Sequence, residues 1–182
     1  MSWEKNVNWE KLEVGLRKYQ GIMNQFTTSE NFTKDFYFQT KFKGFYRVRR
    51  NQDFCDIYFK FLNDHKINET ITFGETLKHI YTKMNRVEAS FASKLVATIN
   101  PNLPVWDKEV LRNIGSELNK NYVKDTDRIE ACIEKYETMK DWYNEKLASI
   151  EGKDFVAKFD NRYPNTILTN LKKIDLILWQ TR

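Results

Sequence analysis

The sequence has few of the residues that build disulfide frameworks, metal sites and phosphate-binding loops. Its 182 residues include 2 cysteines, 2 histidines, 3 prolines and 6 glycines. Cys55 and Cys132 lie far apart and show no metal-ligand spacing, so we expect no metal site and no cofactor. The glycines are isolated from one another, which excludes a P-loop and a dinucleotide-binding loop.

The sequence also lacks a long apolar run. A membrane-spanning helix needs roughly 20 apolar residues, and the charged N-terminal segment has no apolar core of the kind found in signal peptides. Hydrophobic residues make up 41% and charged residues 30% of a chain that is long enough for one core. We therefore expect a single domain over residues 1–182, located in the cytoplasm and not associated with a membrane.

Helical periodicity of apolar residues recurs along the chain, and strand-like alternation does not. The pattern predicts an all-α fold, a compact multi-helix domain of about eight helices. The second of these helices is expected to begin near Ser29 or Asn31 and to continue to about Arg50, and Asn51 is expected to cap the third. The closing segment, residues 165–180, carries a broad apolar face that includes Ile167.

The net charge of +5 is concentrated in one segment. Residues 34–50, "KDFYFQTKFKGFYRVRR", hold six basic groups and one acid, whereas residues 51–182 balance. Cations interleaved with aromatic rings can follow a phosphate backbone and offer stacking surfaces, which makes DNA or another polyanion a candidate partner. The spacing of the phenylalanines equally favours a buried helical face with solvated cations around it. The candidate nucleic-acid-binding residues are Lys41, Lys43, Arg47, Arg49 and Arg50.

The stretch "SFASKLVATINPNLPVWDKEVLRNIG", residues 90–115, carries the candidate catalytic residues. An apolar helix bearing Lys94 ends at two prolines, and Asp107 stands where the next helix should begin. Lys94 and Asp107 are therefore a reacting pair or, alternatively, a surface lysine and an ordinary helix cap. For a reacting pair, Phe91 and Trp106 are the expected pocket walls.

This stretch resembles the core of the helix-hairpin-helix DNA glycosylases over residues 73–115. A lysine on one helix, a proline-bearing loop and "PVWD" opening the next helix match the motif that delivers a lysine nucleophile and a catalytic aspartate in that family. The resemblance implies a glycosylase-like fold, with Lys94 as nucleophile and Asp107 as the acid. The glycines of the family's hairpin are missing from "NRVEASFASK", which favours a shared scaffold without turnover.

Three functions follow as hypotheses. The first is a nucleic-acid-binding module on a glycosylase-like scaffold, and the second is an active base-excision glycosylase or lyase that uses Lys94 and Asp107. The third is a helical protein-interaction or assembly protein. It rests on residues 125–148, where one face of a long amphipathic helix is apolar and could meet a protein partner. The sequence leaves open whether the protein is an enzyme.

Overall fold

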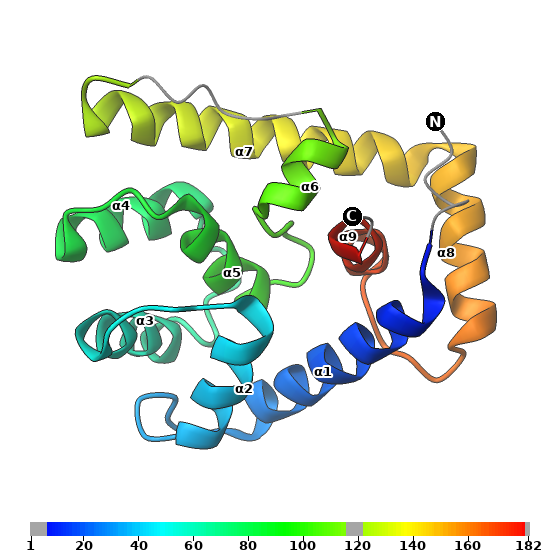
Figure 1. Ribbon diagram of the computed structural model, residues 1–182, viewed down its shortest axis with the longest axis horizontal. Coiled ribbons are helices and arrows are strands. Elements are labelled where there is room, and N and C mark those ends of the chain that lie inside the picture. Colours follow the sequence, from blue (N-terminus) through cyan, green and yellow to red (C-terminus); the bar gives the residue numbers. More distant parts are fainter. Residues whose placement is uncertain (1–6, 116–121, 181–182) are drawn as a thin grey trace.

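The structure is a computed structural model that describes residues 7–115 and 122–180. Every regular element within these ranges is a helix, which confirms the all-α prediction (Figure 1). No helix among the described residues is both long and apolar enough to cross a membrane. In chain order the helices are α1 (Trp9–Thr28), α2 (Phe36–Tyr46), α3 (Gln52–Asp64), α4 (Phe73–Met84), α5 (Ala89–Ile99), α6 (Lys108–Asn113), α7 (Asp125–Ala148), α8 (Ile150–Arg162) and α9 (Asn170–Gln180).

Polar side chains cap several of these helices, two of them as predicted. The Asn51 side chain accepts a hydrogen bond from the first turn of α3, and the Asp107 side chain does the same for α6. Thr72 and Glu75 form a reciprocal capping box at the start of α4. After α6, Gly115 adopts a φ of 68°, a left-handed conformation that glycine tolerates without strain.

The second helix is shorter at both ends than the sequence predicted. It begins after Asp35, whose carboxylate accepts a hydrogen bond of 2.8 Å from the Phe38 backbone N–H, and not near Asn31. It ends at Tyr46 because Arg47 turns into the left-handed region, with φ 55° and ψ 41°. That conformation costs a residue other than glycine about 1 to 3 kcal/mol. It separates the basic segment into a helical part and residues 47–50, which lie outside the helices.

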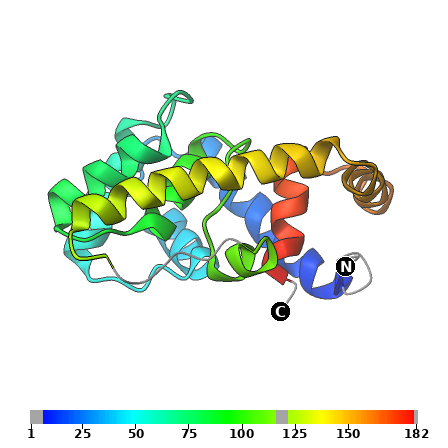
Figure 2. The same cartoon turned by 90° about the horizontal axis from the view of Figure 1, so that it is seen from above.

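Helix α9 lies at the centre of the fold. Figure 1 shows it end-on, with α1, α6, α7 and α8 around it, and Figure 2 shows it standing beneath the long helix α7. It contacts α1, α6, α7 and α8, so it has almost no solvent-facing side. Even Lys172, Lys173 and Asp175 on this helix are buried. Ile167, which precedes α9, is 97% exposed, so the apolar face predicted for residues 165–180 begins later than expected.

The apolar face of α7 is used within the fold. Residues Ile129, Cys132, Tyr136, Met139 and Tyr143 are all buried. The helix packs on α4, α8 and α9 and runs along one edge of the molecule (Figure 1). The face that suggested a protein partner for residues 125–148 is therefore covered by the protein's own helices, and it gives no support to the interaction hypothesis.

Candidate functional site

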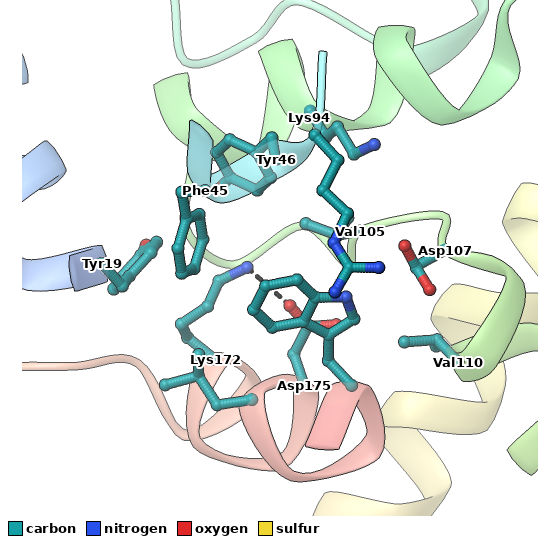
Figure 3. Close-up of a pocket in the computed structure, with 12 residues that line it drawn as sticks. Tyr19, Phe45, Tyr46, Lys94, Val105, Asp107, Val110, Lys172 and Asp175 are labelled. Carbon is teal, nitrogen blue, oxygen red and sulfur yellow. Dashed lines mark hydrogen bonds and ion pairs between the residues drawn. The ribbon is translucent and has the colours of Figure 1, made fainter. Parts of the chain in front are cut away.

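A small pocket lies where α9 meets α1, α2, α5 and the segment that leads into α6 (Figure 3). It brings together residues that are far apart in the sequence, and Lys94 and Asp107 both line it. The charged lining residues are Arg47, Lys94, Asp107, Lys172 and Asp175, the aromatic ones are Tyr19, Phe45, Tyr46 and Trp179, and Val105, Val110 and Leu176 complete the wall.

Lys94 is a buried amine with an unusual protonation equilibrium. Its side chain is on α5, and the residue is only 5% exposed. Its Nζ donates a hydrogen bond of 3.0 Å to Ser90 Oγ and lies 5.0 Å from the centre of the Phe91 ring. Burial lowers the pKa of Lys94 to about 8, although the negative charge of Asp107 opposes the shift. At pH 7 about a tenth of the molecules therefore carry a neutral amine at this position, which is the form that acts as a nucleophile.

Asp107 is held in place by the proline-bearing loop. The Trp106 backbone N–H donates to Ser93 Oγ at 2.9 Å, and the Tyr136 hydroxyl donates to the Pro104 carbonyl at 2.8 Å. One carboxylate oxygen of Asp107 accepts the hydrogen bond that caps α6, and no ion pair joins Asp107 to Lys94 within the described residues. The aspartate is thus a helix cap and, at the same time, an acidic group on the wall of the pocket.

A second lysine in the pocket, Lys172, is protonated at neutral pH. Lys172 Nζ donates to Asp175 Oδ2 at 2.8 Å, and the Tyr143 hydroxyl donates to the other oxygen of the same carboxylate, also at 2.8 Å. Burial disfavours the charge of Lys172, but the attraction of Asp175 outweighs burial and raises the pKa of Lys172 above its usual value. The pocket therefore contains one lysine fixed as a cation and one, Lys94, that can lose its proton.

Two buried tyrosines contribute to the wall of this pocket. Within the part of the chain that the structure describes, the Tyr19 hydroxyl has no hydrogen-bond partner, and both Tyr19 and Tyr46 line the pocket. The space within the pocket is about 30 Å³, roughly the volume of one ordered water. A ligand as large as a nucleobase requires pocket walls that move apart, since ordinary ligand sites measure about 300 Å³ or more.

The two aromatic residues expected as pocket walls lie elsewhere. Trp106 stacks on Phe73, with ring centroids 6.0 Å apart, and Phe91 packs against Phe54 and Tyr58. Neither residue is among those that line the pocket. Both rings are buried in the core, and the Phe91 ring contacts the Lys94 amine there without forming part of the pocket wall.

A basic groove runs over the surface between α1 and α2 and meets the pocket. It consists of two hollows of about 470 and 480 Å³ that share Lys18, Gly44 and Phe45. Phe45, Arg47 and Trp179 line both the groove and the pocket, so the two are adjacent. The cations along the groove are Lys11, Arg17, Lys18, Lys41 and Arg47, and the acid that lines it is Glu10.

The α1 side of this groove was missed in the sequence because residues 1–33 carry balanced charge. Lys11 and Lys18 are seven residues apart, which places them on one face of a helix two turns apart. This seven-residue spacing is the feature of the sequence that indicates the α1 side of the groove. Arg17 is the weakest contributor of the three, since its guanidinium pairs with Glu13 four residues away.

The predicted basic residues separate into different surroundings. Lys41 and Arg47 line the groove. Arg50 instead pairs with Glu88 at 2.6 Å and lies over the Phe91 ring, beside a separate polar hollow. Lys43 and Arg49 line neither the groove nor the Lys94 pocket. The structure thus brings together two of the five predicted cations.

Comparisons with protein-family models, with curated proteins and with solved structures find no match for this chain. The resemblance to helix-hairpin-helix glycosylases therefore stays a prediction. Among the described residues no group of three or more histidine, cysteine, aspartate or glutamate side chains is arranged to hold a metal ion.

Proposed function

We propose that the protein binds nucleic acid along the α1–α2 groove. The observation that carries this proposal is the row of cations from both helices, Lys11 and Lys18 on one side and Lys41 on the other, leading to Arg47 at the pocket. Positive side chains that line a groove replace the counterions of a phosphate backbone, and release of those counterions drives binding. Among the described residues Glu10 is the one acid that lines the groove, so the opposing charge that they contribute is small.

The test is the salt dependence of binding, measured by fluorescence anisotropy with labelled DNA between about 50 and 200 mM salt. The logarithm of the association constant should fall steeply with the logarithm of salt concentration. Lys18→Gln and Lys41→Gln should each reduce the magnitude of that slope by about 0.8, which is the contribution of one phosphate contact. Lys83→Gln removes the same charge from an exposed position on α4, away from the groove, and should leave the slope unchanged.

Absence of DNA binding at the lowest salt concentration would refute the proposal. Equal effects of all three substitutions would also refute it, because such a result would show that net charge and not the groove determines binding.

A second candidate function is covalent capture of an abasic site, and the lowered pKa of Lys94 is the observation that favours it. The neutral amine of Lys94 would attack the aldehyde carbon of the opened sugar. A carbon–nitrogen bond forms, the aldehyde oxygen leaves as water with the two amine hydrogens, and the resulting imine takes up a proton from solvent. Asp107 would stabilise this positive charge across the pocket.

Borohydride converts such an imine to a stable amine, so a covalent adduct on abasic DNA would be visible by mass spectrometry. The adduct should map to Lys94 and should disappear in Lys94→Arg, which keeps a positive charge and lacks the nucleophile. Reaction requires Lys94 to leave Ser90 and the pocket to widen. Failure to trap an adduct on abasic DNA would remove this second function and leave the binding proposal intact.

A further inference from the structure

We propose that the α1–α2 groove holds an unpaired nucleic-acid strand and not a duplex, with one base stacked on Tyr37. This inference rests on the proposed function and adds to it the class of nucleic acid that the groove accepts. Three features of the groove carry it: its width, an exposed aromatic ring at one end, and two helix glycines on its sides.

The width of the groove is set by direct packing of α1 against α2. Helices in direct contact have axes about 8 to 10 Å apart, so the depression above their contact is narrow. A single phosphate backbone fits such a depression with its charges toward Lys18 and Lys41. A duplex is far wider, since its major groove alone measures about 12 Å, and could touch only the rims.

An exposed tyrosine stands where a base could stack. Tyr37 lines the groove and is 62% exposed, and Lys41 Nζ lies 5.3 Å from the centre of its ring. Stacking on a protein ring requires the face of a base, which a duplex hides within its own stack and an unpaired strand presents freely. Because Lys41 Nζ lies over one face of the ring, the base stacks on the opposite face, and the lysine cation meets a phosphate of the same strand.

Two glycines within the helices keep the groove open. Gly21 in α1 and Gly44 in α2 both line it, and a Cβ built at either position would meet nothing within 4 Å. Neither glycine has positive φ or a close neighbour to explain its presence, and glycine is a poor helix former. Their common effect is a bare backbone along the sides of the groove, where a strand can approach closely.

The test compares labelled oligothymidylate with the same strand in a duplex, using the full chain at low salt. The unpaired strand should bind at least about tenfold more tightly. Tyr37→Ala should weaken strand binding by about tenfold through lost stacking, and Tyr37→Phe should retain it. Phe36→Ala is the matched control, because Phe36 is the adjacent residue, is 71% exposed and does not line the groove.

Gly44→Gln supplies an independent test, since it fills the groove with an uncharged side chain. It should weaken strand binding while the thermal unfolding midpoint stays the same or rises, so that lost binding cannot be attributed to unfolding. Thr138→Gln, at an exposed position on α7, is its control.

Equal affinity for strand and duplex, or equal effects of Tyr37→Ala and Phe36→Ala, would overturn this inference. The inference would also be overturned if inorganic polyphosphate displaced the strand and Tyr37→Ala left strand affinity unchanged. Those two results together would identify a site for polyanions without base stacking. In each of these cases groove binding that depends on Lys18 and Lys41 would preserve the proposed function. No binding of either nucleic acid would refute both.

Discussion

Replacing Lys94 with methionine is expected to stabilise the protein at neutral pH. Burial lowers the pKa of Lys94 from 10.5 to about 8. One pKa unit corresponds to about 1.4 kcal/mol, so the protonated amine lowers the free energy of unfolding by about 3 kcal/mol at pH 7. Methionine fills a similar volume and loses the 3.0 Å hydrogen bond to Ser90, which contributes about 1 kcal/mol. The expected net gain is about 2 kcal/mol.

The same shift sets a pH dependence with a definite sign. Because the folded pKa of Lys94 lies below its unfolded value, the unfolded chain binds more protons between about pH 8 and 10.5, and the free energy of unfolding rises with pH across that window. The destabilisation caused by burying the protonated amine is fully present below the folded pKa of Lys94 and absent above its unfolded pKa. Between pH 7 and 9 the rise contributed by Lys94 amounts to about 1 kcal/mol.

Urea unfolding followed by circular dichroism at pH 7, 8 and 9 measures both effects. The unfolding free energy of the wild type should rise toward that of Lys94→Met as pH increases. Lys83→Met, at an exposed position on α4, should leave the pH profile unchanged. Two results would refute the claim that burial lowers the pKa of Lys94. One is a parallel pH dependence of stability for the wild type and Lys94→Met, and the other is a Lys94→Met protein less stable than the wild type at pH 7.

Three further predictions concern stability and can be checked by the same urea unfolding. Gly21→Ala should stabilise the protein by about 1 kcal/mol, because a Cβ there meets nothing within 4 Å and alanine favours the helix; a destabilised variant would contradict an open groove at this position. Gly152→Ala should destabilise the protein by more than about 2 kcal/mol, since a Cβ would lie 1.9 Å from the Lys146 carbonyl oxygen and the start of α8 would have to shift. An unchanged urea midpoint would show that α7 and α8 are farther apart at this position. Asp175→Asn should cost about 3 to 5 kcal/mol by leaving the charge of Lys172 buried without its partner, and a loss below about 1 kcal/mol would argue against that ion pair.

Local features of the fold could be predicted from the sequence because they depend on short-range chemistry. Asn51 and Asp107 cap helices because their side chains reach backbone N–H groups two or three residues away. The end of the second helix could not be predicted in this way. Arg47 is a residue that helices tolerate, and it ends α2 through a backbone conformation that the sequence pattern does not reveal.

The candidate site could be predicted in part. Lys94 and Asp107 were singled out by the helix, proline loop and helix between them, and the pocket has both on its wall. Lys172 and Asp175 were not identified from the sequence, because nothing local indicates that α9 is surrounded on nearly all sides. The groove was missed for a related reason, since its cations come from two helices that approach each other only in the folded chain.

The most direct test of the account is lysine acetylation of the protein with and without oligothymidylate, quantified for each residue by mass spectrometry. Nucleic acid bound in the α1–α2 groove should protect Lys11, Lys18 and Lys41 and leave Lys60 and Lys83 as reactive as in the free protein. Protection spread evenly over these five lysines, or protection of Lys60 and Lys83 with the groove lysines still reactive, would contradict the claim that this groove is the binding site.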